Sequence, residues 1–144
     1  MKTLISGAKQ KITSIFSGSS DGDEAAAERA FQATVRARDR YWAALGSVET
    51  DVVAHAISPS LTGDGPDWPT MRQAYRIIRR DHSIILATDG MADPFEILGG
   101  EGNGFGMELF LDTSDIPAEL AGKPGDLGRI IESWAFDLLR DTAY

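Results

Sequence analysis

The chain has 144 residues, of which 42% are apolar and 25% are charged. This length and composition are typical of one soluble globular domain that buries a hydrophobic core of its own. The chain contains no cysteine, which excludes disulfides and thiolate chemistry. Its formal net charge of −8 argues against a nucleic-acid partner, because phosphates are bound by basic surfaces.

Residues 1–22 are predicted to form an amphipathic helix on a flexible linker. Three lysines interleave with apolar residues that recur at helical spacing: Lys2, Lys9 and Lys11 among Leu4, Ile5, Ala8, Ile12, Ile15 and Phe16. We expect a helix over 3–16, followed by a linker rich in Ser and Gly. The apolar stretch is too interrupted for a signal peptide or a membrane span, so we expect a cytoplasmic protein with no membrane partner.

A second helix is predicted from Asp23 or Glu24 to a stop at Gly46, and it carries the strongest periodic signal in the chain. One stripe recurs at helical spacing and consists of Ala27, Phe31, Thr34, Val35, Arg38, Tyr41, Trp42 and Leu45. The opposite face holds Arg29, Arg36, Asp39 and Arg40. The stripe predicts a helix that packs one side against the rest of the domain.

Strands are expected at 74–80, 83–88 and 105–112, with the first two joined as a hairpin at Asp81-His82. Residues 48–57 fit either a helical turn or a strand, and 58–69 and 89–104 are loops rich in turn-forming residues. A final helix is predicted from about Asp126 to the end, with Ile130, Ile131, Trp134, Phe136 and Leu138 on its apolar side. Together these elements predict an α+β fold, with a central mixed or antiparallel sheet flanked by helices in a domain spanning 23–144.

No catalytic residue, metal site or cofactor is expected from the residue types and their spacing. His55 and His82 are not spaced as a metal-binding pair, and no serine lies in a nucleophile-elbow motif. The Gly-rich run at 99–106 leads into a strand and lacks the lysine of a phosphate-binding loop. Asp89 and Asp93 flank a turn without the spacing of a calcium-binding loop, so turn formation explains them better.

Acidic residues dominate the second half of the chain, since no Lys or Arg occurs between Arg80 and Lys123. This stretch is predicted to be either solvated surface or an acidic face that attracts a basic protein. The candidate partner-binding residues are Asp89, Asp93, Glu96 and Glu101, together with Trp68.

Glu108 lies among Phe, Met and Leu residues in the predicted third strand. A buried carboxylate is costly unless it is paired. We therefore expect Glu108 either to face solvent beside Asp112 or to pair with Arg76, Arg79 or Arg80 on a neighbouring strand.

Three blocks in chain order resemble the suppressor of fused family over roughly residues 40–144. They are Gly65-Pro66-Asp67-Trp68-Pro69 leading into Ala74-Tyr75-Arg76, then Leu86-Ala87-Thr88-Asp89-Gly90-Met91-Ala92-Asp93, and then Gly104-Phe105-Gly106-Met107-Glu108-Leu109. In the second block Ala92 replaces a serine of the family's turn. The third block is the most specific, so Gly104, Phe105, Gly106 and Glu108, with Trp134 on the helix that follows, are the expected structural motif.

The resemblance implies a non-enzymatic protein-binding fold. Animal members bind and restrain a transcription factor, and bacterial members, which this sequence resembles more, are often immunity proteins of polymorphic toxin systems. The leading expectation is an immunity protein that neutralises a basic toxin by binding it. The alternatives are a regulatory or scaffold domain of a longer protein, since the family domain continues past such a final helix, and a hydrolase built on carboxylates near Asp89 and Glu108. The oligomeric state is not predicted.

Overall fold

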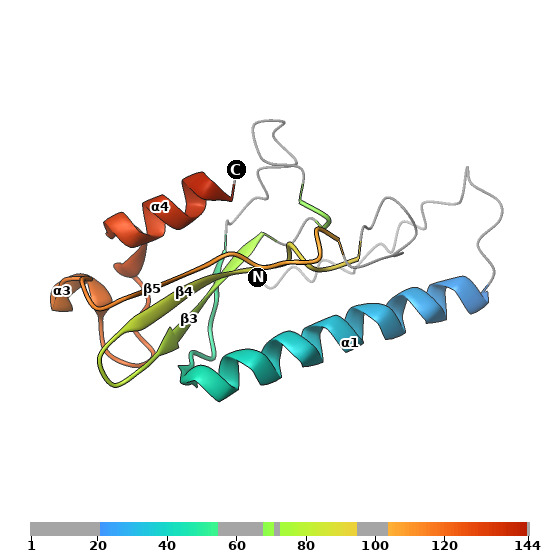
Figure 1. Cartoon of the computed structure of the whole chain (residues 1–144), viewed down its shortest axis with the longest axis horizontal. Helices are drawn as coiled ribbons and strands as arrows, with labels where there is room; N and C mark the ends of the chain where they lie inside the picture. The colour runs from blue at the N-terminus through green and yellow to red at the C-terminus, as the bar shows by residue number, and fades with distance from the viewer. Residues whose placement is uncertain (1–20, 55–67, 71–72, 95–103, 144) are drawn as a thin grey trace, which may run out of the picture.

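The computed structural model describes residues 21–54, 68–70, 73–94 and 104–143. The predicted helix at 3–16, His55, Glu96 and Glu101 lie outside these ranges. Within them the fold is α+β, with a long helix α1 (Asp21–Leu45), an antiparallel sheet and shorter helices near the C-terminus (Figure 1). The predicted fold class is therefore confirmed. No helix in the described ranges has the length and apolarity to cross a membrane.

The sheet is built around a central hairpin. Its strands are β1 (Ser47–Val48), β2 (Val53–Ala54), β3 (Ala74–Arg79), β4 (Ile84–Asp89) and β5 (Phe110–Thr113). They lie in the order β1-β3-β4-β5, with β2 also paired to β3, and all pairs are antiparallel. The strands predicted at 74–80 and 83–88 are confirmed as β3 and β4, and the ambiguous segment 48–57 provides the short edge strands.

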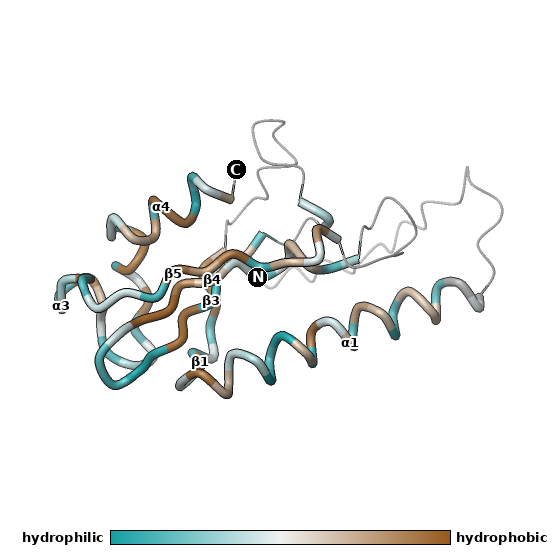
Figure 2. Tube along the Cα trace, in the orientation of Figure 1, coloured by the Kyte–Doolittle hydropathy of each residue, from teal (hydrophilic) through white to brown (hydrophobic). Residues whose placement is uncertain are grey.

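The two faces of the sheet are covered by different helices, as Figure 1 shows. Successive side chains of a strand point to opposite faces. On one face Ile77 and Leu86 pack in a cluster with Phe136 of helix α4 (Trp134–Thr142). On the other face Ile78 and Ile85 pack against Trp42 of α1. The strongest apolar colour in Figure 2 accordingly follows β3 and β4 between the two helices.

The third strand is shorter than predicted, since β5 begins at Phe110 rather than at residue 105. Gly104 and Gly106 have φ values of 51° and 70°, which lie outside the β region, and the chain therefore turns before it enters the sheet. Past this turn the expected alternation holds. Leu111 packs on the α4 side, while Phe110 faces α1, with its ring centre 5.7 Å from that of Trp42.

The C-terminal region also differs from the prediction. A 3-10 turn over Ile130–Glu132 precedes α4, and Ser133 caps this helix by accepting a hydrogen bond from the backbone N–H of Phe136 at 3.3 Å. The predicted apolar side is wrong for three residues that are about half exposed, namely Ile131, Trp134 and Leu138. The buried residues are Ile130, Ala135, Phe136 and Leu139, and the short helix α3 (Ala118–Ala121) was not predicted.

Candidate functional site

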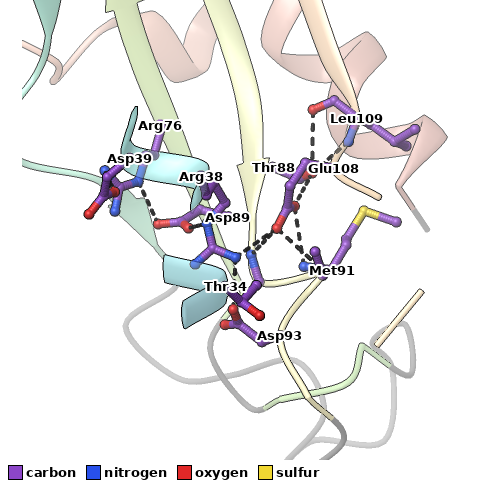
Figure 3. A network of polar contacts seen from close by, with 12 residues as sticks. Thr34, Arg38, Asp39, Arg76, Thr88, Asp89, Met91, Asp93, Glu108 and Leu109 are labelled. Atoms are coloured by element: carbon purple, nitrogen blue, oxygen red, sulfur yellow. Dashed lines mark hydrogen bonds and ion pairs between the residues drawn. The ribbon is translucent and has the colours of Figure 1, made fainter. Parts of the chain in front are cut away.

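A buried ion-pair network centred on Arg38 joins α1 to the end of β4 and to the segment before β5 (Figure 3). Arg38 Nη1 donates to Asp93 Oδ1 at 2.7 Å and to Glu108 Oε1 at 2.9 Å. Arg38 Nε lies 2.6 Å from Asp89 Oδ1, a close ion pair rather than an aligned hydrogen bond. None of these four side chains is more than 8% exposed. One guanidinium therefore pairs with carboxylates from three separate positions of the chain.

The charge of Arg38 is held firmly by these neighbours. Burial acts to lower the pKa of the guanidinium, but the carboxylates of Asp89, Asp93 and Glu108 together outweigh burial, and the pKa is raised above its ordinary value. Arg38 consequently remains a cation under all physiological conditions. It acts as a fixed positive charge and not as a proton donor or acceptor.

Arg76 of β3 extends this group on the other side of Asp89. Its Nε lies 2.8 Å from Asp89 Oδ2, and its Nη1 lies 2.8 Å from Asp39 Oδ1. We call the six residues Arg38, Asp39, Arg76, Asp89, Asp93 and Glu108 the Arg38 network. With all six ionised, its two arginines are opposed by four carboxylates, so the network has an excess of negative charge.

Glu108 also closes the turn that follows β4. Its Oε1 accepts the backbone N–H groups of Gly90 at 3.1 Å and Ala92 at 3.2 Å. Its Oε2 accepts the N–H of Met91 at 3.2 Å and the hydroxyl of Thr88 at 2.7 Å. Consecutive N–H groups that converge in this way form a nest for an anion. Here the anion is a side chain of the same protein, so the carboxylate joins the turn to the segment before β5.

Gly104 is required by close packing as well as by its φ of 51°. A Cβ at this position would lie 2.3 Å from the carbonyl oxygen of Asp93 and 2.6 Å from that of Met91. The adjacent Phe105 N–H donates to the same Met91 oxygen at 2.8 Å, which holds the two segments together. The motif that carries the family resemblance is therefore structural at this residue.

Gly104→Ala is expected to lower the free energy of unfolding by about 3 kcal/mol, because the left-handed backbone and the overpacking each add a cost. Gly106→Ala is the matched control, since Gly106 has a φ of 70° but open space around the added carbon. It should cost only about 1 kcal/mol, the backbone contribution alone. Urea denaturation of both variants measures the difference, and equal losses would contradict a packing role for Gly104.

The structure corrects the predicted acidic face. Asp89 and Asp93 are 0% exposed and are ion-paired within the Arg38 network, so they do not present their charges to a partner. Trp68 is 7% exposed, and its indole N–H donates to the carbonyl oxygen of Ala143 at 3.1 Å, which fastens α4 to the loop before β3. These three residues are buried and stabilise the fold, so they do not form a contact surface.

The solvent-facing interpretation of Glu108 is also wrong, whereas the expected buried ion pair is confirmed with a different arginine. It is paired rather than solvated, and its partner is Arg38 of the helix rather than an arginine of a neighbouring strand. Arg80 instead pairs with Asp112 at 2.6 Å, and Arg79 pairs with Glu49. A signal for the correct partner was present in the sequence, because Arg38 is the one charged residue in the apolar stripe of the second predicted helix.

A groove of about 390 Å³ opens beside the Arg38 network, between α1 and residues 106–110. Tyr41 on the helix and Met107 and Phe110 on the other side line it, and each is about half exposed. The buried side chains of Trp42 and Arg38 also line it, together with the Glu108 side chain, which is 8% exposed. We call this feature the α1 groove. Its sides are apolar and aromatic, whereas the charges that hold it together lie beneath the surface.

The site shows no arrangement for metal binding, since no cluster of three or more His, Asp or Glu in the described residues could hold an ion. The buried carboxylates are engaged by arginines and, at Glu108, also by backbone N–H groups. No family model, curated protein or solved structure matches the chain. The resemblance to the suppressor of fused family stays a prediction from its motifs.

Proposed function

We propose that the chain is a non-enzymatic protein-binding module that holds its partner in the α1 groove. The observation that carries this proposal is the exposure of large apolar side chains around a single groove. Tyr41 is 52% exposed, Met107 52% and Phe110 51%, and the nearby Phe105 is 44% exposed. Clustered exposed apolar groups mark interaction sites, and aromatic residues and Met are enriched where proteins bind each other.

The Arg38 network supports this role by fixing the two sides of the groove. Arg38 belongs to α1 and Glu108 belongs to the opposite side, so their ion pair at 2.9 Å joins the sides directly. Glu108 is held in turn by the nest at residues 90–92. A site that is already ordered loses less conformational entropy when a partner binds.

The narrower proposal is an immunity protein that neutralises a toxin. It rests on the resemblance of the Gly104–Leu109 motif and on the net charge of −8, which would speed association with a basic toxin. The proposed contact surface differs from the acidic loop expected from the sequence, because its two described aspartates are buried. The partner would instead insert apolar side chains into the α1 groove.

Met107→Glu is expected to weaken partner binding at least about tenfold, or about 1.4 kcal/mol, because it places a carboxylate in the apolar groove. The melting temperature should not change, since Met107 is 52% exposed. Trp134→Glu is the matched control, as Trp134 is 48% exposed on α4, across the sheet from the groove. The protein encoded beside this chain should be co-expressed with each variant, purified, and titrated by calorimetry.

Binding that is lost in Met107→Glu and kept in Trp134→Glu is the expected result. Equal affinity in both variants, or loss only in Trp134→Glu, would show that the partner uses another surface. For the narrower proposal, co-expression of the wild-type chain should rescue the growth of cells that produce the neighbouring protein, and absence of rescue would reject toxin neutralisation.

A further inference from the structure

The α1 groove suits an apolar segment that also carries positive charge. Tyr41 and Phe110 offer aromatic surface, which binds apolar side chains and attracts cations to the ring faces. The Arg38 network beneath has four carboxylates and two arginines. Asp39 is 47% exposed, so the buried part of the network has three carboxylates and two arginines. Buried charges are screened by salt less than exposed ones, so this excess of one negative charge favours a cation at the groove. An apolar segment with Lys or Arg should therefore bind in preference to one with Asp or Glu.

The chain itself contains a segment of this chemistry. Residues 2–16 combine six apolar residues at helical spacing with Lys2, Lys9 and Lys11. Residues 1–20 contain three of the 14 Lys and Arg and none of the 22 Asp and Glu, so they carry +3 while the remainder carries −11. No other part of the sequence pairs apolar periodicity with lysine alone.

The segment can reach the groove from its point of attachment. It precedes Asp21, the first residue of α1, and Thr34 and Tyr41 at the groove come 13 and 20 residues later. These positions lie about 20 and 30 Å along the helix axis. Residues 3–16 span about 21 Å if helical, and residues 17–20 add up to about 14 Å when extended. A reversal at residues 17–20 therefore lets the segment run back along α1 to the groove.

The face of α1 along this route is also apolar. Ala27 and Phe31 precede Thr34 on the stripe that leads into the groove, and both are partly buried. Charged residues such as Arg36 and Arg40 lie on the other side of the helix and are exposed. A segment that follows the stripe thus meets apolar surface first and the groove at its end.

We infer that residues 2–16 occupy the α1 groove of the same chain as an internal ligand, an inference that rests on the proposed binding role of this groove. The lysines of the segment provide the positive charge, and its Leu and Ile side chains contact Tyr41, Met107 and Phe110. An external partner then binds by displacing the segment, and it resembles the segment in being apolar and basic.

The inference can be tested by photo-crosslinking in the full chain. A benzoylphenylalanine is placed at position 107, or at position 134 as the control, since both side chains are about half exposed. Crosslinked peptides are identified by mass spectrometry after irradiation of the purified protein. Position 107 should yield crosslinks to residues 2–16, and position 134 should not. The triple variant Lys2→Glu, Lys9→Glu, Lys11→Glu should lose them, while the same three lysines changed to Arg should keep them.

Mixing the chain that carries benzoylphenylalanine with a 15N-labelled chain distinguishes occupation of the groove by the same chain from occupation by a second copy. Both peptides of each crosslink are expected to contain 14N, because they come from the same chain. Crosslinks between a 14N peptide and a 15N peptide would overturn the inference, since they would show that the segment binds the groove of a second copy. Absence of crosslinks to residues 2–16 from position 107 would also overturn it. That result leaves the proposed function standing if Met107→Glu still abolishes binding of the external partner, so the two failures are distinguishable.

Discussion

Replacing Arg38 by methionine is expected to lower the free energy of unfolding by about 3–5 kcal/mol, the cost of breaking a buried ion pair by removing one partner. Methionine fills much of the same volume but leaves Asp93 and Glu108 without the Arg38 guanidinium between them. Asp89 keeps Arg76 as a partner, so the loss is concentrated on the other two carboxylates. Urea denaturation followed by circular dichroism measures the change.

Arg40→Met is the control for this experiment, because Arg40 lies two residues away on the same helix and is exposed. It should change stability by less than about 0.5 kcal/mol, as is usual for surface substitutions. Arg38→Lys should recover only part of the loss, since an ammonium group cannot reproduce the fork of a guanidinium. A loss below about 1 kcal/mol in Arg38→Met, the range of an exposed ion pair, would contradict a central role for Arg38.

Glu108→Gln is expected to destabilise the protein by about 2–3 kcal/mol, although it keeps the size and shape of the side chain. The glutamate uses both oxygens as acceptors, one for Gly90 and Ala92 and the other for Met91 and Thr88. An amide has only one oxygen, so its NH₂ group must face donors in either orientation. Hydrogen exchange should therefore accelerate at the amides of residues 90–92, where NMR can follow each N–H separately.

Asp112→Asn provides the comparison, because Asp112 also pairs with an arginine but its side chain is 32% exposed. Its cost should stay within about 1 kcal/mol, with no change in exchange at residues 90–92. Combining Glu108→Gln with Arg38→Met should destabilise by less than the two separate losses added together, because both remove the same contact. Full additivity would show that Glu108 stabilises the turn independently of Arg38.

The apolar pattern was sufficient to predict the long helix, which buries one stripe, and the central hairpin, which is buried on both faces. The second predicted helix corresponds to α1, and the two apolar runs at 74–80 and 83–88 form the central hairpin. Prediction failed where local backbone geometry overrides the apolar pattern. The alternation at 105–112 suggested a strand along its whole length, but Gly104 and Gly106 with positive φ form a turn at its start, and the strand begins only at Phe110.

The site was harder to predict than the fold because its partners are far apart in sequence. Arg38 is separated from Asp93 by 55 residues and from Glu108 by 70, and no local pattern specifies such pairs. The acidic composition of 81–119 suggested an exposed face, yet Asp89 and Asp93 in this segment form ion pairs with arginines of α1 and β3. An arginine within an apolar helical stripe is a signal that a buried acidic partner exists, but the identity of that partner depends on the topology.

The long separation of Arg38 from its carboxylates also constrains when the domain becomes functional during synthesis. The ribosome releases α1 well before Asp89, Asp93 and Glu108. Until these residues emerge, the Arg38 side chain has none of its three carboxylate partners and is hydrated. Contacts between such distant residues carry a large closure cost and form late in folding. Residues 106–110, which complete the network, also form one side of the α1 groove. Docking of the helix and formation of the groove are thus one event, and a nascent chain has no binding surface until this segment has left the ribosome.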